Sequence, residues 1–137
     1  MSVEENKVIF QVITDELFNH KNLGVLDEYL SSDYTNHTAP PGMPTDANGQ
    51  KLLFKMYIEA FPDMRYTIDD LIAEGDKVVA RHTVRATHAG ELMGIPPSSK
   101  SVVFSGITIM RIVESQITDH WGITDMLSLW QQIGAAP

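Results

Sequence analysis

Histidines are the side chains in this chain that are most suited to proton transfer, because imidazole alone has an unperturbed pKa near neutrality. His82 and His120 lie in two long β-branched segments, at positions that can face one cavity. Asp125 follows the segment of His120 and is a carboxylate partner for it if its side chain turns inward. The plainer alternatives stay open: half-buried histidines satisfied by neighbouring groups, and an aspartate that caps a helix. The pattern predicts general acid/base chemistry on these residues.

Several other chemistries are excluded or disfavoured by composition. The 137 residues include no Cys, which excludes disulfides, thiolate nucleophiles and zinc–thiolate or iron–sulfur sites. The five histidines show no metal-binding spacing, so a metal site is not expected, and no phosphate loop, nucleophile elbow or dinucleotide motif is present. The net charge of −8 disfavours nucleic acid and anionic membranes as partners.

The elements that must position these residues are predicted from hydrophobic periodicity. Helices are expected in the first half at a stretch that begins with the capping box Ser2/Glu5, over residues 23–30 and over residues 48–61. A short β-prone segment, 34–38, and an irregular proline loop, 39–44, lie between the second and third of them.

The second half is predicted to be mostly strand. Strands are expected over residues 65–74, 77–88, 101–113 and 116–124, followed by a closing helix with its C-terminal stop at Gly134. Helices first and hairpin-linked strands afterwards indicate an α+β fold. We expect a cone-shaped, curved antiparallel sheet packed against three to four helices, which encloses a hydrophobic pocket, with residues 1–137 forming a single domain.

Alternation along the strands predicts which side chains enter the pocket. Even-numbered positions of 77–88 are the more apolar set, and they include His82. Residues 101–113 are apolar on both faces, so the outer face is expected to be covered by a helix or by a second subunit. Asn36 either forms a turn or orients a ligand oxygen, and Trp121 is a core, interface or ligand-contacting residue.

Several sequence segments resemble one known family. They are Asp33-Tyr34-x-Asn36, Thr87-His-Ala-Gly-Glu-Leu-Met-Gly-Ile-Pro-Pro97, Phe104-Ser-Gly106, Met110-Arg-Ile-Val113, Asp119-His-Trp121 and Leu129-x-Gln-Gln-Ile-Gly134. Their order and spacing are similar to those of the SnoaL-like polyketide cyclases, within the nuclear-transport-factor-2-like superfamily. The resemblance covers nearly the whole chain.

The resemblance implies an enclosed hydrophobic pocket, a homodimer or higher homo-oligomer, and intramolecular aldol chemistry that uses no metal and no organic cofactor. In such cyclases an aspartate acts as general acid/base. The pocket residues expected to contact a small hydrophobic substrate are Tyr34, Asn36, His88, Phe104, Thr108, Trp121 and Gly122.

Two positions depart from the family pattern. The residue two after His120, where the resemblance implies an aspartate, is Gly122, and a histidine expected on the preceding strand is Thr108. Asn36 and His88 are retained. A glycine supplies no proton, and a threonine hydroxyl does not titrate near neutrality.

Three functions therefore remain open from the sequence. The first is a cyclase-type enzyme acting on a small carbonyl compound by cyclisation, isomerisation or dehydration, with its acid/base role moved to His82 or His120. The second is a non-catalytic carrier or sensor of a hydrophobic metabolite, and the third is a cofactor-independent hydroxylase. An acidic N-terminus without a signal-peptide pattern predicts a soluble, cytoplasmic protein.

Overall fold

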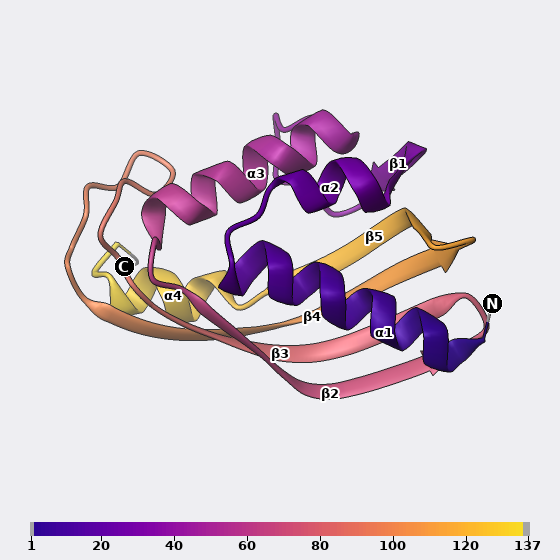
Figure 1. The fold of residues 1–137 in the computed structure, drawn as a ribbon. Coiled ribbons are helices and arrows are strands. Elements are labelled where there is room, and N and C mark those ends of the chain that lie inside the picture. The colour runs from indigo at the N-terminus through magenta and orange to yellow at the C-terminus, as the bar shows by residue number, and fades with distance from the viewer. Residues whose placement is uncertain (1, 136–137) are drawn as a thin grey trace.

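The computed structural model describes residues 2–135, which form an α+β fold as the sequence predicts (Figure 1). In chain order the elements are α1 (Val3–Thr14), the π-helical turn η1 (Asp15–Asn19), α2 (Gly24–Tyr29), β1 (Leu30–Asn36), α3 (Ala47–Ala60), β2 (Arg65–Glu74), β3 (Lys77–Thr87), β4 (Ser101–Val113), β5 (Gln116–Thr124) and α4 (Met126–Gln132).

One curved sheet forms the body of the fold, with α1, α2 and α3 on one of its faces (Figure 1). The strand order is β1-β5-β4-β3-β2, and every pairing is antiparallel except that of β1 with β5. The parallel pair is the one exception to the antiparallel sheet that we predicted. It aligns Asn36 with His120, which brings a residue of the first third of the chain beside the last strand.

The first strand also begins earlier than predicted, at Leu30 rather than at Tyr34. Ser31, Ser32 and Asp33 look like a helix stop in the sequence, but the pairing of Leu30 with Ile117 of β5 extends the strand through them. Tertiary pairing here overrides weak local β-propensity.

Helix α1 begins as its capping box predicts: the Ser2 hydroxyl accepts the Glu5 N–H at 3.1 Å, and the Glu5 carboxylate accepts the Ser2 N–H at 3.3 Å. The wider turn η1 that follows was not predicted from the sequence. There Leu17 is buried in the core, while Phe18 lines the cavity described below.

The alternation of β3 agrees with the prediction that its even positions face inward. Val78, Ala80, His82 and Val84 are buried, whereas Lys77, Arg81 and Arg85 are exposed. The outward face of β4 and β5 is open in the single chain, where Ile107 and Ile123 are 51% and 76% exposed. Among residues 2–135, no helix is both long and apolar enough to cross a bilayer.

Candidate active site

A cavity of about 400 Å³ lies between the inner face of the sheet and the helices. All five strands contribute side chains to its wall, together with α1, η1, α3, α4 and the proline loop after β1. The wall is mostly aromatic and aliphatic, and none of the residues that line it is Lys, Arg, Asp or Glu. A buried ion would therefore meet no counter-charge there, so the cavity suits an uncharged ligand.

His120 and Gly122 lie on the same face of β5, and both line the cavity. A Cβ atom added to Gly122 would lie only 3.1 Å from His120 Nε2 and 3.6 Å from Thr108 Oγ1. The imidazole therefore lies against the place where a side chain at position 122 would begin. A side chain at position 122 would therefore crowd the His120 ring in its present position.

Tyr34 holds the other nitrogen of the His120 ring. Its hydroxyl lies 3.3 Å from His120 Nδ1, and the Tyr34 side chain is 4% exposed. Burial raises the pKa of the Tyr34 phenol well above its usual value, so the hydroxyl keeps its proton. A phenol can donate or accept a hydrogen bond, so it can pair with His120 Nδ1 in either ring tautomer.

His82 lies across the sheet, against Gly106. A Cβ atom at Gly106 would lie 2.9 Å from His82 Nε2, and the His82 ring stacks on Tyr66 with centroids 4.7 Å apart. His82 Nδ1 is buried without a hydrogen-bond partner. A buried N–H without an acceptor is costlier than an unused lone pair, so the neutral ring carries its proton on Nε2.

Both imidazoles are neutral at pH 7. Burial lowers the pKa of His82 to about 4, although Asp69 opposes the shift. Burial, together with smaller electrostatic contributions from His82 and His37, also lowers the pKa of His120 to about 4. Because a positive charge on His82 disfavours one on His120, the two rings are not readily protonated at the same time.

An amide pair, Asn36 and Gln50, lines the cavity beside His120. Asn36 Nδ2 donates to Gln50 Oε1 at 3.0 Å, and Asn36 Oδ1 accepts from the backbone N–H of Thr38 at 3.0 Å. Asn36 was predicted from the sequence as a site residue, whereas Gln50 and Thr38 were not. Gln50 could have been found as the polar member of the apolar stripe that continues with Leu53, Phe54 and Tyr57 on α3.

Of the predicted site residues, six line the cavity together: Asn36, His82, Phe104, Thr108, His120 and Gly122. Tyr34 is connected to them through His120.

Besides Tyr34, three predicted site residues lie outside the cavity wall. The Asp125 carboxylate accepts the Ser128 N–H at 3.1 Å and so caps α4, which is the plainer of its two predicted roles. Trp121 points to the opposite face of β5, where its ring stacks on His37 at 4.7 Å. His88 is fully buried, and its Nδ1 accepts the Ser98 N–H at 3.1 Å, which fixes the loop between β3 and β4.

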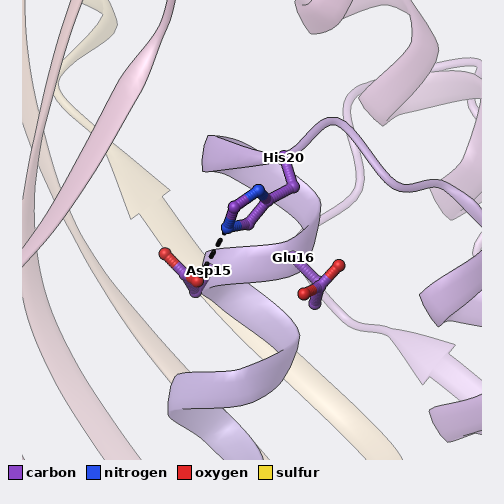
Figure 2. A group of neighbouring side chains, drawn as sticks. All are labelled: Asp15, Glu16 and His20. Carbon is purple, nitrogen blue, oxygen red and sulfur yellow. Dashed lines mark ion pairs between the residues drawn. The ribbon is translucent and has the colours of Figure 1, made fainter.

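Asp15, Glu16 and His20 form the one cluster of metal-ligating side chains among residues 2–135 (Figure 2). His20 Nε2 lies 3.2 Å from Asp15 Oδ2, and both side chains are more than half exposed. None of the three lines the cavity. An exposed ion pair accounts for this geometry.

Comparison with known proteins gives a consistent picture. The family model described as SnoaL-like polyketide cyclase matches residues 9–133. The nogalonic acid methyl ester cyclase of Streptomyces nogalater is 29% identical over 119 residues, which are 85% of this chain and 89% of that protein.

Two solved structures share the whole fold. AclR from Streptomyces galilaeus, a candidate hydroxylase, has a TM-score of 0.88 and 26% identity, covering 99% of this chain and 100% of its own. A candidate polyketide cyclase from Acidithiobacillus ferrooxidans has a TM-score of 0.83 and 32% identity, and covers 100% of both chains. Because the family model matches residues 9–133, the chain belongs to the SnoaL-like polyketide cyclase family.

Proposed function

We propose that this protein is a cyclase-type enzyme that closes a ring in a small, uncharged carbonyl compound by intramolecular aldol addition. The observation that carries the proposal is the imidazole of His120 against Gly122, with Nε2 3.1 Å from the place of the absent Cβ. A titratable group thus lies beside the position where the family resemblance implies an aspartate. Shared folds commonly hold relocated reactive groups in this way.

His120 serves as the general base. With its own proton on Nδ1, hydrogen-bonded to the Tyr34 oxygen, it presents the Nε2 lone pair to the cavity. It takes a proton from the carbon next to a substrate carbonyl, and the electron pair of that C–H bond becomes the enolate. The resulting imidazolium keeps the same Nδ1–H bond to Tyr34, so no new partner is needed.

His82 serves as the hydrogen-bond donor. Its Nε2–H stabilises the negative charge that develops on the enolate oxygen, in a cavity wall without competing charges. The enolate carbon then attacks a second carbonyl of the same molecule and forms the new C–C bond. The alkoxide that results takes back the proton from His120, so the protein returns to its starting state.

The substrate is uncharged because the cavity has no residue to balance a carboxylate. A carboxyl group on the substrate would have to be esterified or otherwise neutral. The name of the Streptomyces nogalater relative, a methyl ester cyclase, supports this class.

A hydroxylase is the second candidate, favoured by the likeness to AclR at 26% identity over nearly the whole chain. One experiment separates the candidates: the protein is incubated in air with nogalonic acid methyl ester, and the products are analysed by mass spectrometry. An aldol cyclisation leaves the mass unchanged and alters the chromatographic retention, whereas hydroxylation adds one oxygen atom. Recovery of unchanged ester that binds saturably would instead support a carrier and contradict the proposal.

A homo-oligomer stays a prediction. The outward face of the sheet, with Ile107 and Ile123 exposed, is the face that we expect from the sequence to be covered by a helix or by a second subunit. Light scattering on the purified protein measures the oligomeric state directly.

A further inference from the structure

The orientation of the Asn36 amide is fixed by its neighbours. Asn36 is 3% exposed, and its Oδ1 accepts both the backbone N–H and the hydroxyl of Thr38, at 3.0 and 3.2 Å. A backbone N–H can only donate, so this end of the amide must be the oxygen. The Thr38 hydroxyl is polarised in the same direction, because its oxygen accepts the Gly122 N–H at 2.8 Å.

Gln50 stands at the end of this chain of hydrogen bonds. Because Asn36 presents its Nδ2, Gln50 must present its Oε1 to it, at 3.0 Å, and its NH2 group must point elsewhere. Gln50 lines the cavity and is 5% exposed. Within residues 2–135 its amide nitrogen donates to no protein group. An amide N–H that belongs to a cavity-lining residue and has no protein acceptor is available to donate to a ligand acceptor.

The position of Gln50 is held from both sides. Asp46 caps α3 by accepting the Gly49 N–H at 3.0 Å, and the Asn36 N–H donates to the Thr45 carbonyl at 2.8 Å. The first turn of α3 also packs closely on the proline loop, since a Cβ at Gly49 would lie 1.8 Å from the Pro44 oxygen. These contacts leave the Gln50 amide little freedom to move away from the cavity.

We propose that Gln50 is a specificity-determining residue whose Nε2–H donates to a carbonyl oxygen of the ligand. The ligand class is that of the proposed function, on which this inference rests. Three hydrogen bonds run in one direction: the Gly122 N–H donates to Thr38, the Thr38 hydroxyl to Asn36, and the Asn36 amide to Gln50. Each of these bonds polarises the next. The chain ends on a donor that faces the cavity and selects for ligands with an acceptor there.

The test uses 2-tetralone, a neutral bicyclic ketone, and two variants that remove the donor in different ways. Gln50→Met deletes the amide. Asn36→Asp keeps the size of residue 36 but accepts only, so it turns the Gln50 amide and directs its oxygen to the cavity. Gln11→Met, at an exposed position of α1, is the matched control. Binding is measured by calorimetry and the ketone C=O stretch by infrared difference spectroscopy.

We expect the wild type to lower the C=O stretching frequency of bound 2-tetralone, and both site variants to raise it again while weakening binding about tenfold. The Gln11→Met control should match the wild type. An unchanged stretch and affinity in both site variants would overturn the role of Gln50 and leave the proposed function standing. Failure of 2-tetralone to bind the wild type would overturn the assignment of the cavity to neutral carbonyl compounds, and this inference with it.

Discussion

His120 Nε2 lies 3.1 Å from the point where a Cβ atom of residue 122 would stand, so a side chain at Gly122 would crowd the imidazole. Gly122 is one of the two positions at which this chain departs from the pattern implied by its family resemblance. His120 belongs to the retained segment Asp119-His-Trp121, so the histidine is kept where the carboxylate two residues after it is lost.

Gly122→Ala tests this relationship. The added methyl group must move the His120 ring by a few tenths of an ångström, and misplacement of a reacting group is costly, so we expect turnover to fall about tenfold or more. Gly122 is in a strand, where alanine costs no backbone strain, so the thermal unfolding temperature should change little. Gly24→Ala, in α2 and outside the cavity wall, is the control. Wild-type turnover in Gly122→Ala would show that His120 keeps its working position beside a side chain at residue 122.

Tyr34→Phe tests the partner of His120 Nδ1. Without the phenol oxygen, the Nδ1–H tautomer loses its acceptor, and the proton should move to Nε2, where it blocks the base. We expect turnover to fall by at least tenfold, and the loss of one hydrogen bond to destabilise the fold by about 1 kcal/mol. Nitrogen-15 NMR of the imidazoles checks the tautomers, with His82 as an internal reference. A His120 tautomer that is the same in both proteins would speak against the assignment.

The stability of the fold should depend on pH because of the two imidazoles that line the cavity. Their pKa values are about 4 in the folded protein and near 6.5 in the unfolded chain, so between these values the unfolded chain binds more protons. The free energy of unfolding therefore rises with pH through this window, and the contribution of the two histidines to it is lost as the pH falls from about 6.5 toward 4. Carboxyls with lowered pKa values, such as Asp63 and Asp119, lose their contribution only at still lower pH.

Urea unfolding between pH 4.5 and 7.5 measures this dependence. The wild type should lose several kcal/mol on acidification, whereas a variant with His82→Gln and His120→Gln should show a much flatter profile. Equal slopes in the two proteins would mean that other groups govern the acid sensitivity.

Strand alternation predicts the inward face of β3, whose even positions are the more apolar set, and His82 lines the cavity on that face. For β5 the sequence left both faces open, and the structure shows that the face of His120 lines the cavity. Asp125 illustrates the opposite case, because a helix N-cap and a cavity carboxylate occupy the same place in the sequence, and only the Ser128 N–H contact distinguishes them.

The amide pair could not be predicted, because it depends on contacts between distant segments. Asn36 and Gln50 are 14 residues apart, with an irregular loop between them whose course no periodicity describes. The parallel pairing of β1 with β5 brings Asn36 opposite His120, and the sequence predicted neither that partner nor the early start of β1. Local patterns therefore identified the strands and their faces, while the connection between them required the structure.

Exchange of the benzylic C–H hydrogens of 2-tetralone in D2O, followed by proton NMR, measures directly whether neutral His120 and His82 promote enolisation in the uncharged cavity. We expect the wild type to accelerate exchange over buffer, His120→Ala to lose about a hundredfold or more of this acceleration, and His82→Ala to lose a smaller share. His20→Ala, at an exposed histidine outside the cavity, should exchange at the wild-type rate. Folded His120→Ala and His82→Ala proteins that both exchange 2-tetralone as fast as the wild type would show that neither imidazole promotes enolisation.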